Sequence, residues 1–168
     1  KNFTLLLELN IEQFENFLIE SKNKEMPISY YGTRRPPIWN KNTFDIIRKS
    51  GCNIISKSKI MEKNHNVEIK KNTKKYLKIF NEILDEKILE NYFNIFNVCI
   101  WSVVKKKIKE LIEPRLKLVI EEIILGENLL KKYPPKSIVM ISEAGRSEQI
   151  ISTLAKKYDE IDILHLQE

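Results

Sequence analysis

The sequence predicts an α/β protein with a Rossmann-like parallel sheet of about five strands, flanked by helices. Two stretches predict this fold. Residues 138–141 are apolar and β-prone, and a polar turn, an amphipathic helix and a second apolar run at residues 161–166 follow them. Strand, helix and strand in this order form a βαβ unit with a parallel sheet. The same order occurs near the start of the chain, between residues 3–9 and residues 28–31.

The remaining elements follow from local signals. In chain order we predict a strand at 3–9, a helix from Asn10 to about Ser21, a strand at 28–31, a helix from Trp39 to Gly51, and a strand at 52–56. Asn10 suits a helix N-cap, and Gly51 suits a C-cap. Residues 57–71 are polar and show no clear period, so we expect a loop there with His65 exposed.

Residues 73–132 have helical periodicity, and we expect a helical insertion before the last βαβ unit, within a single Rossmann-like domain of residues 1–168. Pro114 should kink or restart a helix. Two groups of residues stand out in this insertion: an aromatic stripe of Tyr92, Phe93, Phe96 and Trp101, and a basic run of Lys105, Lys106, Lys107 and Lys109. We interpret the aromatic stripe as core and the basic run as a solvated helix face.

Composition narrows the class of protein. The chain has 29 Lys and Arg against 23 Asp and Glu, a net charge of +6, and no apolar run long enough to span a membrane. The lysines are spread along the chain, which disfavours a nucleic-acid partner. Cys52 and Cys99 sit among apolar residues without metal-ligand spacing, so we expect two small core side chains, no metal and a cytoplasmic protein. Since the chain lacks an initial Met and ends on a strand, we expect a fragment.

The turn from Ser142 to Ser147 is the first candidate site, because ligands of such folds bind where a strand ends and a helix begins. Gly145 permits close backbone approach, while Arg146 and Ser147 supply donors to a phosphate or a sugar hydroxyl. Glu143 is placed to act as a general base. An ordinary loop with Gly145 as helix cap is the alternative. The turn has neither GxGxxG nor GxxxxGK[ST], so we expect no nucleotide cofactor.

Three further residues are expected on the same rim of the sheet. Arg34 and Arg35 follow a predicted strand, in a loop with two prolines, and suit recognition of phosphate or carboxylate. A loop pinned by salt bridges, with Trp39 filling the core, is equally consistent with the pattern. His165 ends the last predicted strand, as a proton carrier or as a hydrogen-bonded structural histidine.

Together, the opening LLLELN, the YYGTRRPPIWN loop and the late PKSIVMISEAGRSEQI…ILHLQE segment resemble the N-terminal half of GT-B-type glycosyltransferase-like proteins of surface polysaccharide and glycan synthesis. The resemblance implies that this domain shapes the acceptor side of an interdomain cleft, while a missing C-terminal domain binds the nucleotide-sugar donor. Relatives often carry Gln-His-Gly after this unit. Here Gln167 is followed by Glu168, so no histidine role can be transferred.

The resemblance also implies roles and partners. Glu143 becomes the base for the acceptor hydroxyl, and the ligand-binding residues are Arg34, Arg35, Ser142, Gly145, Arg146, Ser147 and His165. The acceptor is a glycan or a lipid-linked molecule, with peripheral contact at the inner face of the membrane. The full-length protein is expected to be a transferase without metal, and this fragment alone to be inactive.

A non-catalytic α/β module is the alternative, one that binds a partner protein through its helical insertion. It predicts an exposed apolar patch on the helices of residues 73–132 and no concave rim.

Overall fold

The computed structural model describes residues 3–34, 36–96, 98–141, 145–158 and 160–166. The chain divides into two compact units, which we describe separately. Residues 1–61 and 125–168 form the sheet unit, and residues 62–124 form the helical unit. Helix α6, Trp101–Lys132, contributes residues to both.

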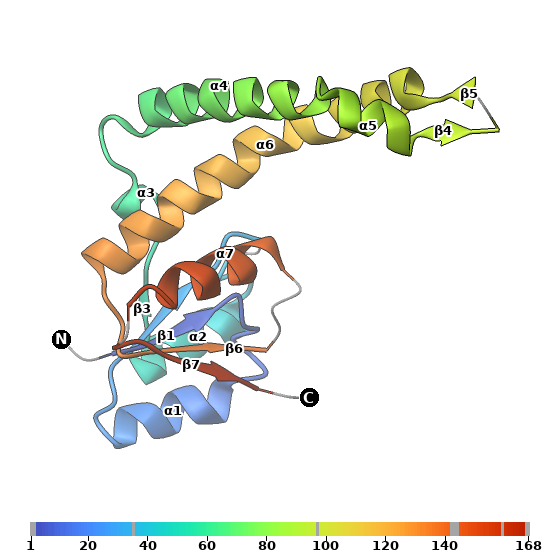
Figure 1. The fold of residues 1–168 in the computed structure, drawn as a ribbon. Coiled ribbons are helices and arrows are strands. Elements are labelled where there is room, and N and C mark those ends of the chain that lie inside the picture. Colours follow the sequence, from blue (N-terminus) through green and yellow to red (C-terminus); the bar gives the residue numbers. More distant parts are fainter. Residues whose placement is uncertain (1–2, 35, 97, 142–144, 159, 167–168) are drawn as a thin grey trace. The chain divides into compact units, whose positions relative to one another are not determined.

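The sheet unit is built on a five-stranded parallel sheet, which confirms the predicted fold class (Figure 1). Its strands are β1 (Thr4–Leu7), β2 (Ile28–Tyr31), β3 (Asn53–Ile54), β6 (Ser137–Met140) and β7 (Asp162–His165). The order is β3-β2-β1-β6-β7, and Thr4 is in register with both Ile28 and Ser137. The chain therefore leaves β1 in one direction along the sheet and returns beside it with β6, which makes β1 and β6 the switch point.

Helices cover both faces of this sheet. They are α1 (Glu15–Asn23), α2 (Lys41–Ser50), the short α3 (Lys57–Ile60), the end of α6, and α7 (Arg146–Ala155). Leu6 and Val139 pack with residues of α1 and α2, whereas Leu5 and Ile138 pack with residues of α6 and α7. Because neighbouring strand residues point to opposite faces, each apolar strand supplies two cores, as a doubly covered parallel sheet requires.

Helix α2 has well-defined ends because both are capped. The Asn40 side chain accepts a hydrogen bond from the Thr43 amide at 2.7 Å, and the Thr43 hydroxyl reaches back to the Asn40 backbone. This is a capping box with Thr in place of Glu. At the other end Gly51 adopts φ 68°, the left-handed C-cap that the sequence predicts.

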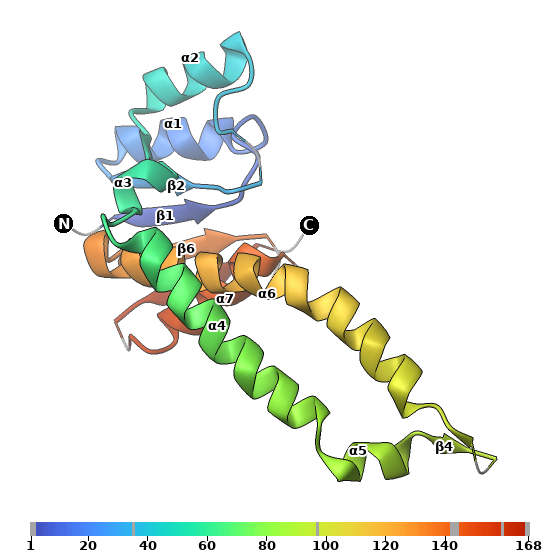
Figure 2. The same cartoon turned by 90° about the horizontal axis from the view of Figure 1, so that it is seen from above.

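The helical unit contains α4 (His65–Leu84), α5 (Lys87–Tyr92), the strands β4 (Asn94–Ile95) and β5 (Val98–Cys99), and the start of α6. The two strands pair antiparallel as a hairpin between α5 and α6 (Figure 2). Ile69 of α4 packs against Ile120 and Ile124 of α6, with Leu116 beside them.

The loop predicted at residues 57–71 is wrong, because α3 and the first turns of α4 occupy it. His65 begins α4 and is buried, whereas the sequence predicted an exposed residue. His65 and the buried Ile69 are four residues apart and share one helix face, so the histidine points inward.

The prediction that the aromatic stripe forms a helical core is also wrong in part. Asn94–Ile95 and Val98–Cys99 are hairpin strands instead of helix, and Phe96 and Cys99 are exposed. Tyr92, at the end of α5, is exposed as well. Trp101 alone of the stripe is fully buried. Helix α6 is not divided at Pro114, since a proline removes only its own amide from the ladder and the other hydrogen bonds can continue.

Candidate functional site

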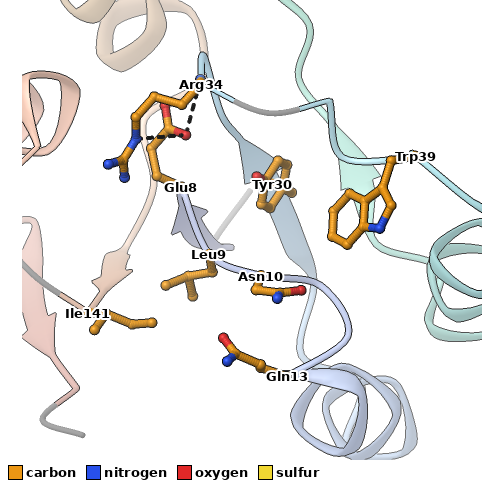
Figure 3. A pocket seen from close by; sticks show the side chains of 8 residues that line it. All are labelled: Glu8, Leu9, Asn10, Gln13, Tyr30, Arg34, Trp39 and Ile141. Carbon is orange, nitrogen blue, oxygen red and sulfur yellow. Dashed lines mark hydrogen bonds and ion pairs between the residues drawn. The ribbon is translucent and has the colours of Figure 1, made fainter.

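A cavity of about 320 Å³ lies at the carboxyl end of the parallel sheet, within the sheet unit (Figure 3). It is lined by Glu8, Leu9, Asn10, Gln13, Tyr30, Arg34, Trp39 and Ile141. Glu8, Leu9, Asn10 and Ile141 directly follow β1 or β6, Tyr30 lies in β2, and the other three lie in the connections after β1 and β2. The cavity is thus at the switch point between β1 and β6, where open α/β sheets bind their ligands.

Glu8 organises one wall of the cavity. It is the first residue after β1, its side chain is only 2% exposed, and its φ is 56°. Its carboxylate accepts hydrogen bonds from the Thr33 amide at 2.5 Å, the Thr33 hydroxyl at 2.7 Å and the Arg34 amide at 3.3 Å. A left-handed backbone is uncommon for glutamate, and such residues concentrate at functional sites. Here the turn aims Glu8 at the loop that follows β2.

Arg34 joins three elements of the rim. Its guanidinium forms an ion pair with Glu8 at 3.6 Å and donates to the carboxylate of Glu148 in the first turn of α7. Both carboxylate side chains are nearly buried, whereas the Arg34 side chain is 55% exposed. A buried carboxylate needs such a partner. The charge of Arg34 is therefore balanced by protein groups, as expected for a loop pinned by salt bridges.

The pinned loop has a second tie to α7. The Thr33 and Ser147 hydroxyls lie 2.8 Å apart, within hydrogen-bonding distance. Gly145 precedes α7, and a Cβ added to it would lie 2.0 Å from Oε2 of Glu148. Its φ of −79° needs no glycine, but a Cβ here would require the Glu148 carboxylate to move.

The part of the cavity away from the ion pairs of Glu8, Arg34 and Glu148 is lined by amide and indole side chains. Figure 3 shows Trp39 and the amides of Asn10 and Gln13 on the side away from the Arg34 guanidinium. Trp39 is placed by a hydrogen bond from its amide to the Thr43 hydroxyl at 3.2 Å, just before the cap of α2. It is partly exposed rather than filling the core. Amide side chains both donate and accept, and an indole supplies an apolar face.

The predicted site residues fall into three groups. Ser142, Glu143 and Arg35 lie outside the described residues. Arg34, Gly145 and Ser147 are brought together by the ties between the β2 loop and α7. Arg146 is exposed on α7, and His165 is exposed at the end of the edge strand β7; neither is among the residues that line the cavity.

The sequence analysis did not predict Glu8 or Gln13 as cavity residues, nor that Trp39 lines the cavity. We extended the first strand to Leu9 and assigned Asn10 to a helix cap, whereas β1 ends at Leu7 and α1 begins at Glu15. The signal was present in the order of residues. Two polar residues, Glu8 and Asn10, follow an apolar run directly, and such positions lie at the carboxyl edge of a parallel sheet.

The described residues contain neither a metal-binding cluster nor a membrane-spanning helix. No group of three or more His, Cys, Asp and Glu side chains there could hold a metal ion. Among the same residues no helix combines the length and the hydrophobicity needed to cross a membrane.

No protein-family model, curated protein or solved structure matches this chain. Its function must therefore be argued from the residues and the geometry of the cavity.

Proposed function

We propose that this chain is the acceptor-side domain of a GT-B-type glycosyltransferase-like protein, and that a glycan acceptor binds in the cavity at the β1–β6 switch point. The observation that carries the proposal is the lining of that cavity, where two amides and an indole face open space beside a pinned arginine.

This lining suits a neutral, polyhydroxylated ligand. Each sugar hydroxyl donates and accepts, and Asn10 and Gln13 offer both functions within one side chain. The indole of Trp39 offers a flat apolar surface for the C–H face of a sugar ring. Specificity would come from the hydroxyls that pair with the amides, because an analogue lacking one leaves a polar group unpaired.

A nucleoside diphosphate fits the cavity less well. Arg34 is the cationic residue among the described lining residues, and Glu8 and Glu148 already engage it. Phosphate recognition needs uncompensated donors or cations. In the proposal the nucleotide-sugar therefore binds to a second domain, and this chain by itself has no transferase activity.

The proposed chemistry is the transfer of a sugar to an acceptor hydroxyl. The hydroxyl oxygen bonds to the anomeric carbon, its proton passes to a base, and the nucleoside diphosphate leaves with the electrons of the broken bond. From the sequence we assign the base to Glu143, with Arg35, Ser142, Arg146 and His165 near the cleft. The reaction would take place on the cytoplasmic side, at the inner face of the membrane if the acceptor is lipid-linked.

The test is a titration of the 168-residue chain with methyl glycosides, oligosaccharides and nucleotide-sugars, followed by isothermal calorimetry and protein-observed NMR. We expect glycosides to bind and to perturb the NMR signals of residues 8–13 and 39. Trp39→Ala should lower the affinity for glycosides at least tenfold. Phe44→Ala is the matched control, since Phe44 is equally exposed but does not line the cavity. Tighter binding of a nucleotide-sugar than of any glycoside at these residues would contradict the assignment.

One observation favours the alternative function, a non-catalytic module that binds a partner protein. Large apolar side chains of the helical unit are exposed on α4, α5 and α6, among them Tyr76, Ile83, Ile88 and Leu111. If these side chains form one contiguous patch, that patch would mark an interaction site. A folded full-length protein that binds neither glycosides nor nucleotide-sugars would make this alternative the better one.

A further inference from the structure

The end of α5 and the β4–β5 hairpin carry the two most exposed large apolar side chains among the described residues. Phe96 is 96% exposed and Tyr92 is 77% exposed, and Ile95 and Val98 are more than half exposed. Scattered apolar residues on a surface are ordinary, but a contiguous set of large ones at the end of a hairpin is not. Because these side chains remain in water, burying them against another surface would still gain most of their transfer free energy.

The hairpin has little support of its own. Each strand has two residues and, among the described residues, pairs only with the other strand. A two-stranded hairpin is only marginally stable in water. Phe96 also has φ 49°, a left-handed conformation that is a true outlier for a bulky residue. The base is firmer, since Phe93 stacks on the buried Trp101 with ring centroids 4.9 Å apart. The base thus holds an apolar tip in contact with solvent.

The charge pattern around the tip indicates what would cover it. Residues 91–104 contain no Asp, Glu, Lys or Arg, and the basic run Lys105, Lys106, Lys107 and Lys109 follows immediately on α6. An uncharged segment with Tyr, Phe and Trp, preceded by Glu90 and followed by lysines, is typical of interfacial membrane segments. Lysines beside such a segment gain about 1 kcal/mol each near an anionic surface.

Two of these lysines have neighbours that reduce their charge. Lys105 donates to Asp85, and Lys107 lies 2.7 Å from Glu110. Lys106 and Lys109 have Glu110 and Glu113 on the same exposed stretch of α6. The electrostatic part of the attraction is therefore moderate, and the apolar tip must supply most of the affinity.

We propose that the β4–β5 hairpin docks on anionic lipid bilayers, with Phe96, Ile95 and Val98 entering the interface and the lysines of α6 facing the headgroups. Protein–protein interfaces also have aromatic cores with few charges, but they are enriched in arginine, and residues 91–109 contain none. The inference rests on the hairpin alone, so it can fail while the glycan-binding proposal stands, and the reverse.

The test is sedimentation of the 168-residue chain with vesicles of phosphatidylcholine alone and with 30% phosphatidylglycerol, a composition chosen for the assay. We expect the chain to bind the anionic vesicles, with an affinity that falls in high salt. Phe96→Ser should lower this affinity about tenfold, because it removes one phenylalanine from the interface. Phe44→Ser, on α2 of the sheet unit, is the matched control and should bind as the unmodified chain does. Circular dichroism verifies that both variants fold.

Two outcomes would overturn the proposal. One is equal binding of Phe96→Ser and Phe44→Ser to anionic vesicles, which would make the attraction a general effect of net charge. The other is no binding to either vesicle. If a photo-crosslinker at position 96 then captured a protein, the hairpin would be a protein-binding surface.

Discussion

The two units differ in what they do with their apolar side chains. The sheet unit buries the apolar residues of its central strands completely, on both faces of the sheet. In the described part of the helical unit the buried hydrophobic side chains are Ile69, Leu84, Trp101, Ile120 and Ile124, while many others are exposed. Amphipathic helices alone do not make a core; they need a second layer to cover the apolar stripe. The difference supports a sheet unit that acts as the stable scaffold of the cavity, and it is the basis for our proposal that an external surface covers the helical unit.

Substitutions along α6 test this difference most strongly. Leu129 is fully buried in the core of the sheet unit, whereas Leu111 on the same helix is mostly exposed in the helical unit. We expect Leu129→Ala to lower the free energy of unfolding by about 2–5 kcal/mol, because it removes buried methyl groups and leaves a cavity. Leu111→Ala should change it by less than about 0.5 kcal/mol.

Urea denaturation followed by circular dichroism measures both values. Alanine is the replacement in each case, so the helix propensity of the new residue is the same. Equal losses would mean that Leu111 is part of a core and that the helical unit is stabilised like the sheet unit.

The ion pairs of the two units should differ in the same direction. Arg34→Ala removes the guanidinium from two nearly buried carboxylates and should cost about 1–3 kcal/mol, toward the lower end because Arg34 itself is half exposed. In the helical unit the hydrogen bond from Lys105 and its charge lower the pKa of Asp85, but that pair is open to solvent. Lys105→Ala should therefore have no measurable effect on stability.

Arg34→Lys separates charge from geometry in the first of these pairs. Lysine keeps the positive charge but cannot reach two carboxylates with a planar fork, so an intermediate stability is expected. A stability of Arg34→Ala equal to that of Lys105→Ala, in thermal or urea unfolding, would show that the pinned loop contributes nothing to the scaffold.

The two cysteines give the third comparison. Burial raises the pKa of the Cys52 thiol from its usual value near 9 to about 12, whereas Cys99 is exposed. Between those pH values the unfolded state loses the Cys52 proton and the folded state keeps it. Stability is therefore unaffected below pH 9 and falls as pH rises toward 12, by about 1.4 kcal/mol per pH unit at most.

Unfolding free energies measured from pH 8 to 10.5, with Cys52→Ala as reference, isolate this contribution from that of the tyrosines and lysines. A thiol reagent at pH 8 should modify Cys99 in the folded chain and Cys52 only after denaturation. Rapid modification of Cys52 in the folded chain would show that its part of the sheet unit opens readily.

The fold of the sheet unit was predictable because its signals are local. The strand at residues 28–31 and the end of α2 at Gly51 agree with the structure, since an apolar run and a glycine C-cap act through neighbouring residues. The cavity was not predictable in the same way. It gathers residues from loops after three different strands, and its wall depends on the left-handed conformation of Glu8.

The errors in the helical unit have a common cause. We assigned periodic apolar residues to a core, but period alone does not show whether a second layer covers the stripe. Two short features were not predicted either. A helix begins at His65 within a polar stretch, and Asn94–Ile95 pairs with Val98–Cys99 in a hairpin. Propensity over so few residues is weak, and the surrounding chain decides.

Hydrogen exchange of backbone amides, measured by mass spectrometry with and without anionic vesicles, tests the central claim most directly. The account predicts strong protection of β1, β2 and β6 in both conditions, and fast exchange in the β4–β5 hairpin that slows when vesicles are added. A hairpin as protected as the sheet in water, or one whose exchange no vesicle changes, would contradict the proposal that the hairpin docks on a membrane surface.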